Sequence, residues 1–155
     1  MLIYLSNCII FFMKTAQQIL NDKTYNEILS IEPDRPVIDA LIIMAEYKIG
    51  ALLVMNKNKL LGIVSERDYA REIILKGKSS KISTVEEIMT KNIITIDASD
   101  RFDKGLELMT ENRIRHLPVM ENKKVIGMLS LGDLAKETIS HQKFLIEQLE
   151  SFIAG

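Results

Sequence analysis

The sequence is poor in the residues that build disulfides and metal sites. Its 155 residues include one cysteine, Cys8, and two histidines, His116 and His141. A lone cysteine cannot form an internal disulfide, and so few soft ligands argue against a structural zinc site. We therefore expect no disulfide framework and no metal, and the composition favours a reducing, cytoplasmic location.

Neither sign of charge dominates the sequence. The 20 lysines and arginines are balanced by 21 aspartates and glutamates, which leaves a net charge of -1 and no basic stripe. Phosphate contacts normally need such a stripe, so nucleic acid is not an expected partner. The apolar share of 47% is ordinary for a globular protein, and the length suits one compact domain or two small, closely packed ones.

Long hydrophobic runs are scarce as well. Residues 1–12 are mostly apolar, but a spanning helix takes about 20 residues, and the segment lacks the basic start and cleavage site of a signal peptide. A short membrane-surface anchor is one interpretation. We favour Met13 as the initiator, because residues 13–20 begin cleanly as a helix. Residues 1–14 are then an extension, and a membrane is not an expected partner.

The sequence also lacks the common catalytic signatures. It contains no Gly-x-Ser-x-Gly elbow, no Walker phosphate loop, no His-Glu-x-x-His and no Gly-x-Gly-x-x-Gly. Asp68 and Asp133 could serve as an acid/base pair only if both reached one substrate, and nothing in the sequence indicates that. We therefore expect no catalytic residue and no enzyme activity.

The strongest pattern in the chain is an internal duplication. Shifted by 65 residues, segment 49–72 falls on segment 114–137 with 10 of 24 positions identical and no gap. Upstream, residues 15–20 (TAQQIL) echo residues 84–89 (TVEEIM). Repeats of this kind determine the architecture, so they are interpreted first. We place copy one at residues 15–82 and copy two at residues 83–155, with the longer final helix in copy two.

Each copy shows the same succession of patterns. A short helix and a short strand precede a helix with apolar residues at helical spacing, as at Val37, Leu41 and Met44. Two strands joined by a polar turn follow, and a final helix leaves from the second strand. The pattern predicts an α/β (α+β sandwich) fold, in which each copy forms a small three-stranded sheet with helices.

A Ser-x-x-Asp motif stands at the start of the final helix in both copies. It comprises Ser65 and Asp68 in copy one and Ser130 and Asp133 in copy two. As a structural feature it is a capping box, worth about 1 kcal/mol. As a functional feature, the free N–H groups of a helix start attract phosphate, and a carboxylate can accept ribose hydroxyls. The two interpretations are compatible, and recurrence alone proves neither.

Positive charge before the second sheet distinguishes the copies. Arg113, Arg115 and His116 precede a strand in copy two, whereas copy one has the uncharged residues 50–53 in place of residues 115–118. Guanidinium and imidazole groups at a sheet edge suit phosphate neutralisation, although a solvated charge run is the common alternative. The copies are therefore chemically unequal.

Three segments together resemble a known family, the CBS-domain pair or Bateman module. They are GIVSERDYAREIILKGKSS, VEEIMTKNIITI and LMTENRIRHLPVMENKKVIGMLSLGDLAKE, and the resemblance extends over about residues 15–154. More narrowly, the sequence resembles the small stand-alone pairs of bacteria and of plant organelles. The resemblance implies a pseudo-two-fold disc with two clefts between the repeats, where relatives bind AMP, ADP, ATP, NAD(H) or S-adenosylmethionine.

The resemblance also implies roles for individual residues. Aspartates bind ribose, serines and basic residues contact phosphate, and backbone groups line the adenine pocket. Because copy one departs from the basic pattern, we expect one strong site and one weaker or empty site. The implied ligand-binding residues are Ser65, Arg67, Asp68, Ile94, Thr95, Arg115, His116, Leu117, Pro118, Ser130 and Asp133.

We therefore expect a non-catalytic sensor that binds an adenine nucleotide, with AMP favoured, and transmits its occupancy to a regulated protein. A homodimerisation module with vestigial clefts is one alternative, and a receptor for S-adenosylmethionine is another. A homodimer is also expected, because pairing would bury apolar helix faces that a lone pair of repeats would expose. An apolar stripe also runs along the final helix. The stripe comprises Leu134, Ile139, Gln142, Leu145, Ile146, Leu149, Phe152 and Ile153.

Overall fold

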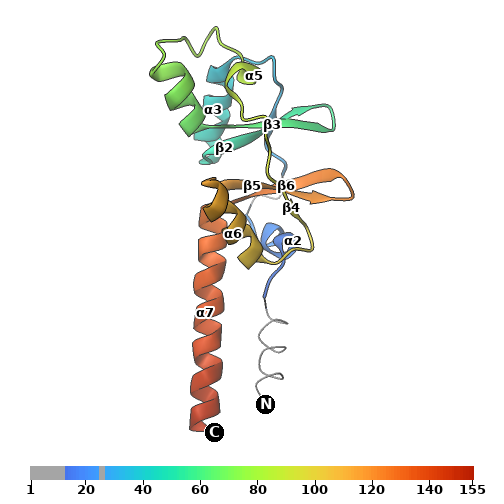
Figure 1. The fold of residues 1–155 in the computed structure, drawn as a ribbon, viewed down its shortest axis with the longest axis vertical. Coiled ribbons are helices and arrows are strands. Elements are labelled where there is room, and N and C mark those ends of the chain that lie inside the picture. Colours follow the sequence, from blue (N-terminus) through green and yellow to red (C-terminus); the bar gives the residue numbers. More distant parts are fainter. Residues whose placement is uncertain (1–12, 25–26) are drawn as a thin grey trace. The chain divides into compact units, whose positions relative to one another are not determined.

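A computed structural model describes residues 13–24 and 27–155. The predictions for residues 1–12, a surface anchor or a segment before the true start, lie outside the described residues. The chain divides into two compact units. The copy-one unit comprises residues 27–94 and 122–127, and the described residues of the copy-two unit lie within 1–26, 95–121 and 128–155. Figure 1 labels their helices and strands.

The copy-one unit is a three-stranded sheet with helices. Its order is β1-β2-β3, with β1 parallel to β2 and β2 antiparallel to β3. The second and third strands pair from Ala51 opposite Ser65 to Asn56 opposite Lys59. Its elements are β1 Ser30–Ile31, α3 Val37–Tyr47, β2 Ala51–Asn56, β3 Lys59–Ser65, α4 Glu66–Asp68, a π-helix over Tyr69–Ile74 and α5 Val85–Ile88.

The core of this unit lies between the sheet and α3. Apolar residues at helical spacing on α3 and alternate residues of the strands meet there, as the periodicity predicts. Burying these side chains is the main stabilising term for so small a unit. The cluster comprises Ile31, Val37, Ala40, Met44, Leu52, Val54, Val64, Ile73, Val85 and Ile88.

The copy-two unit repeats this plan and ends in a much longer helix. Its sheet has the order β4-β5-β6, with β4 parallel to β5. Figure 1 shows the last helix, α7, continuing well beyond α6. The elements are α2 Ala16–Asn21, β4 Ile96–Asp97, α6 Phe102–Asn112, β5 His116–Glu121, β6 Lys124–Ser130 and α7 Leu131–Ala154. Residues 124–127 of β6 are grouped with the copy-one unit. The predicted fold class, with a three-stranded sheet in each repeat, is confirmed.

The 65-residue offset extends to the backbone conformation. Lys48 ends α3 and Arg113 ends α6, and both adopt the left-handed conformation with φ 54°. Non-glycine residues seldom take this conformation, so its occurrence at matched positions is a structural signature of the duplication. It also places Arg113 at a helix end, where it turns the chain toward β5.

Each unit contains the short opening helix that the sequence places in the other copy. In α2, the N–H groups of Ala16 and Gln17 donate to the carbonyls of Asp100 and Ala98, at 2.8 and 3.0 Å. In α5, the N–H of Val85 donates to the carbonyl of Arg35 at 2.9 Å. The compact units therefore do not coincide with the sequence repeats. The repeat boundaries 15–82 and 83–155 stay a prediction.

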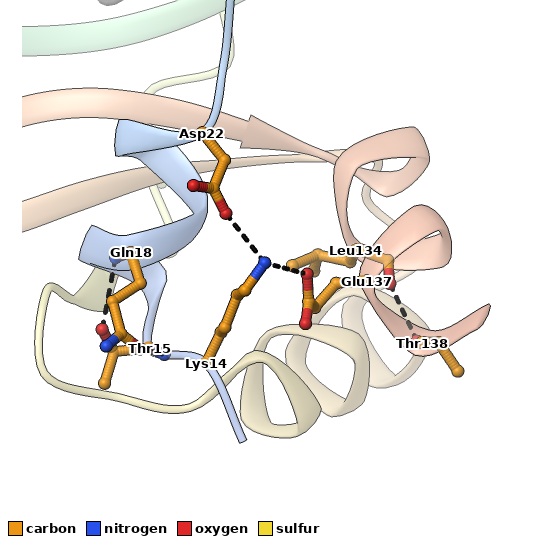
Figure 2. Close-up of polar contacts among 7 residues, drawn as sticks. All are labelled: Lys14, Thr15, Gln18, Asp22, Leu134, Glu137 and Thr138. Carbon is orange, nitrogen blue, oxygen red and sulfur yellow. Dashed lines mark hydrogen bonds and ion pairs between the residues drawn. The ribbon is translucent and has the colours of Figure 1, made fainter. Parts of the chain in front are cut away.

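A lysine connects α2 to α7 inside the copy-two unit. Lys14 Nζ lies 2.9 Å from Asp22 Oδ2 and 3.3 Å from Glu137 Oε2 (Figure 2). The hydrogen bond to Asp22 is the main cause that raises the pKa of Lys14, against the opposing effect of partial burial. A capping box between Thr15 and Gln18 begins α2 in the same view.

Two local predictions need adjustment. The first strand of each copy is only two residues long, because only Ser30–Ile31 and Ile96–Asp97 pair with the next strand. The final helix of copy one is a three-residue α-helix followed by the π-helix, which ends at Ile74. In copy two the same position begins a continuous helix of 24 residues.

Candidate functional site

The strand-to-helix turn of copy one is a closed capping box. Asp68 Oδ2 accepts from the Ser65 backbone N–H at 2.8 Å and from the Ser65 hydroxyl at 2.7 Å. In return, the Asp68 N–H donates to Ser65 Oγ at 3.2 Å. The serine and the aspartate therefore satisfy each other, and the structural interpretation of the motif is confirmed here.

The corresponding turn of copy two has the same box and a longer helix behind it. Asp133 Oδ2 accepts from the Ser130 N–H at 2.8 Å, and the Asp133 N–H donates to Ser130 Oγ at 3.1 Å. The box begins α7, so the partial positive charge of a 24-residue helix is directed at this turn. Copy one offers only three α-helical residues at the matching position.

In each copy, a backbone hydrogen bond holds the residue that precedes the second strand beside the strand-to-helix turn. In copy one the Glu66 N–H donates to the Gly50 carbonyl at 3.1 Å, and in copy two the Leu131 N–H donates to the Arg115 carbonyl at 2.8 Å. Gly50 and Arg115 are related by the 65-residue offset. Copy two therefore positions an exposed guanidinium where copy one has no side chain.

The structure adds a lysine that sequence reasoning missed. Lys23 Nζ lies 3.0 Å from Asp133 Oδ2 and 3.0 Å from the carbonyl oxygen of Met128. The side chains of Lys23 and Asp133 are 31% and 23% exposed, so the ion pair is partly shielded and still open to solvent. The two residues are 110 positions apart, and no local pattern signals the contact.

The remaining predicted residues divide between the two units. The copy-two unit holds Thr95, Arg115, His116, Leu117, Pro118, Ser130 and Asp133, and the copy-one unit holds Ser65, Arg67, Asp68 and Ile94. Leu117 and Pro118 are buried in β5. His116 begins β5 and is half-buried, while Thr95 is exposed. Their roles toward a ligand stay predictions.

The structure offers no metal centre in the part of the chain it describes. Within residues 13–24 and 27–155, no three histidine, cysteine, aspartate or glutamate residues gather so as to hold an ion. Over the same ranges no helix combines the length and the apolar character needed to cross a bilayer. The copy-two turn brings a carboxylate, an ammonium and a helix start together, and the backbone of Arg115 lies beside it.

Comparison with known proteins identifies the family. The family model for the CBS domain matches residues 23–75 and 85–140. The chain belongs to the CBS-domain family, as a tandem pair of the regulatory, ligand-binding type. It is 39% identical over 127 residues to the mitochondrial CBS domain-containing protein CBSX3 of Arabidopsis thaliana, covering 79% of this chain and 62% of the relative's length.

A bacterial relative and a solved structure support the assignment. The CBS domain-containing protein YhcV of Bacillus subtilis is 24% identical over 123 residues, which cover 79% of this chain and 87% of the relative. A solved structure of a protein with CBS domains from Burkholderia ambifaria is 45% identical, with a TM-score of 0.79. It covers 82% of this chain and 95% of that one. Stand-alone pairs of this kind are generally regulatory and non-catalytic.

Proposed function

We propose that the chain is a non-catalytic sensor that binds an adenine nucleotide, AMP by preference and otherwise ADP, ATP or NAD(H). The observation that carries this proposal is the copy-two turn. There Lys23 and the start of α7 lie at Asp133, and Arg115 lies beside the same turn. We expect a change in occupancy to be transmitted to a partner protein.

The chemistry of this turn suits both halves of a nucleotide. The ammonium of Lys23 and the guanidinium of Arg115 offer positive charge and donors to phosphate, and the start of α7 adds the partial positive charge of its helix dipole. The carboxylate of Asp133 is an acceptor for ribose hydroxyls. It already accepts from Lys23 at 3.0 Å, so a bound nucleotide would join an existing polar network.

The proposal also ranks the two copies. Copy one has glycine at the position of Arg115, and Asp68 is held by the hydroxyl of its own capping serine at 2.7 Å. We therefore propose a strong site in copy two and a weaker one in copy one. Arg67, half-buried beside Asp68, is the remaining cation through which copy one would contact phosphate.

A receptor for S-adenosylmethionine is the second candidate. The CBS-domain pair of protein MJ0100 was crystallised with 5′-methylthioadenosine and S-adenosyl-L-methionine, and it aligns with a TM-score of 0.70. Its identity of 24% supports likeness of fold alone. A cationic sulfonium ligand would gain less from Lys23 and Arg115 than a phosphate would, so we favour the nucleotide.

Partners and location complete the proposal. We propose a homodimer that acts on a regulated protein in the cytoplasm, although the plant relative is a mitochondrial protein. A structural dimerisation module with vestigial clefts is the third candidate, because several apolar residues of α7 are exposed. Failure of every ligand to bind would favour it.

The proposal is tested by calorimetric titration and thermal shift with AMP, ATP, NADH and S-adenosylmethionine. A ligand at 100 times its dissociation constant should add about 2.7 kcal/mol to the free energy of unfolding. We expect AMP to stabilise most and to show one tight site. Two equal sites would contradict the ranking, and no response to AMP, ATP or NADH would overturn the function.

Matched aspartate variants locate the site. Asp133→Ala should weaken AMP binding by about 10-fold to 100-fold, the value of hydrogen bonds to a charged group. Asp68→Ala removes the equivalent carboxylate of copy one and should leave the tight site intact. Equal losses in both variants, with both proteins folded by circular dichroism, would refute the assignment to copy two.

A further inference from the structure

The projecting part of α7 carries a row of exposed apolar side chains. We call Ile139, Ile146, Leu149 and Ile153 the α7 stripe; they are 55%, 54%, 58% and 83% exposed. Figure 1 shows this part of the helix continuing past α6. Four large aliphatic residues in one row are more than the scattered apolar residues of an ordinary surface.

The stripe has the spacing of a helix-pairing seam. Ile139, Ile146 and Ile153 recur every seven residues, and Leu149 follows Ile146 by three, so they occupy the two apolar positions of a heptad. Gln142 follows Ile139 by three residues, so a polar residue occupies the matching heptad position there.

The helix contacts its own unit on a different side. Leu134 is fully buried, and the His141 ring meets Phe102 edge-on with 5.6 Å between centroids. At 3.6 residues per turn these two residues lie roughly 100° around the helix from the stripe. The α7 stripe therefore lies on a different side of the helix from the contacts of Leu134 and His141 within its unit.

We propose that the α7 stripe pairs with the α7 stripe of a second copy of this chain, and that the two helices run antiparallel. The flanking charges select this occupant. Lys143 and Glu150 lie one heptad apart along the same side of the stripe, and both are exposed. When Ile146 packs level with Leu149 of the second copy, Lys143 lies beside Glu150 of that copy, and the symmetry repeats the pair.

Other registers lose this complementarity. A parallel pair would suit isoleucine and leucine in these heptad positions, but it sets Lys143 beside Thr138 and Glu150 beside Leu145. If the two antiparallel helices overlap by one more heptad, toward the body of the unit, Lys143 of one copy lies beside Lys143 of the other, and the two charges repel. The selected register gives Ile146 with Leu149 and Gln142 with Ile153 as its layers. It overlaps the helices from about residue 140 onward, which is the projecting segment.

This proposal specifies the homodimer named above and does not depend on nucleotide binding. It is tested first by charge reversal in the full chain, with sedimentation velocity measured over a range of concentrations. Lys143→Glu and Glu150→Lys each turn two attractive pairs into repulsive ones, so each should weaken the dimer by about tenfold. An equimolar mixture of the two variants should regain the wild-type affinity, because each unlike pair is attractive again.

Glu147→Lys is the matched control, because it makes the same charge change on the outer side of α7. It should leave the dimer unchanged. Weakening by Glu147→Lys equal to that by Glu150→Lys would overturn the proposal, since net charge alone would then account for it. Failure of the mixture to regain affinity would overturn the register.

A core substitution tests the stripe itself. Ile146→Glu should leave a 17.7 kDa monomer at concentrations where the wild type is dimeric. Its helix content should be unchanged, because the side chain is already 54% exposed. A dimer that persists in Ile146→Glu would show that the second copy binds elsewhere. AMP titration of the same variant separates this result from the proposed function, since binding should survive.

Cross-linking tests the direction of the helices. Chains carrying Gln142→Cys and chains carrying Ile153→Cys, both with Cys8→Ser, are mixed and oxidised. Antiparallel pairing should give disulfides between unlike chains, because residues 142 and 153 share a layer. Disulfides mainly between like chains would indicate parallel pairing and overturn the proposal.

Discussion

The copy-one and copy-two units have the same Ser-x-x-Asp turn in different surroundings. In copy one Asp68 is held by the hydroxyl and the N–H of Ser65, whereas in copy two Asp133 bonds the N–H of Ser130 and pairs with Lys23. The copy-one turn leads into a π-helix, and the copy-two turn begins α7. A motif duplicated in sequence therefore acquires its electrostatics from what packs on it, and the cation comes from a distant segment.

The largest difference that we expect between the units is in the stability lost when a buried glycine is replaced by alanine. A Cβ at Gly62 would lie 2.7 Å from Met89 Sδ and 2.9 Å from the Thr90 carbonyl oxygen, which accepts from the Ile63 N–H. Because backbone cannot yield easily, Gly62→Ala should cost about 1–3 kcal/mol of unfolding free energy.

Gly105→Ala is the comparison within the copy-two unit, at a position where copy one has Ala40. The added Cβ would meet only side-chain tips, with Leu134 Cδ1 at 2.9 Å, and alanine gains about 1 kcal/mol of helix propensity inside α6. We expect a net change smaller than that caused by Gly62→Ala. Denaturant unfolding measures both, and a larger loss at Gly105 would reverse the comparison.

The next effect concerns Lys23, the cation that pairs with the copy-two aspartate. Lys23→Met removes the ammonium 3.0 Å from Asp133, so AMP affinity should fall by about tenfold, as for a lost charge-assisted hydrogen bond. Lys104→Met is the control, because it breaks a surface ion pair with Asp100 in the same unit. Unchanged AMP affinity in Lys23→Met, measured by calorimetry, would remove the electrostatic basis for ranking copy two first.

Replacing the capping serines with alanine should cost more stability in copy one than in copy two. Ser130→Ala loses one hydroxyl contact at the start of α7 and should cost about 1 kcal/mol. The Ser65 hydroxyl both accepts from the Asp68 N–H and donates to its carboxylate, so Ser65→Ala should cost more, about 1.5–2 kcal/mol. Urea denaturation measures both variants. Equal losses would mean that the two boxes are energetically alike.

The smallest effect is a pH dependence in the copy-two unit. Because the pKa of Lys14 is raised above its ordinary value of 10.5, its contribution to stability is present below that pH and is lost as the pH rises through the folded-state value. The difference in unfolding free energy between the wild type and Lys14→Met should therefore become smaller above about pH 10.5. The effect should stay below about 1 kcal/mol, because exposed ion pairs are weak. A difference constant across alkaline pH would contradict it.

The sequence predicted what depends on local pattern. Helical and alternating periodicity located α3, α6 and the paired strands, and the offset between copies predicted matched capping boxes at Ser65 and Ser130. Lys23 was missed because its contact with Asp133 depends on long-range packing of α2. The π-helix was missed because a change in hydrogen-bond register leaves the apolar spacing almost unaltered.

Each opening helix packs in the unit of the other copy, which affects both the folding of the chain during synthesis and the behaviour of fragments. The copy-two unit needs both α2, which precedes the sheet of copy one, and α7, which follows the sheet of copy two, so both must be synthesised before that unit can close. Closing so long a loop slows folding more than it lowers stability. A gene fragment cut at the repeat boundary would encode α2 without the unit it packs on. We therefore expect the two halves to fold best when both fragments are co-expressed.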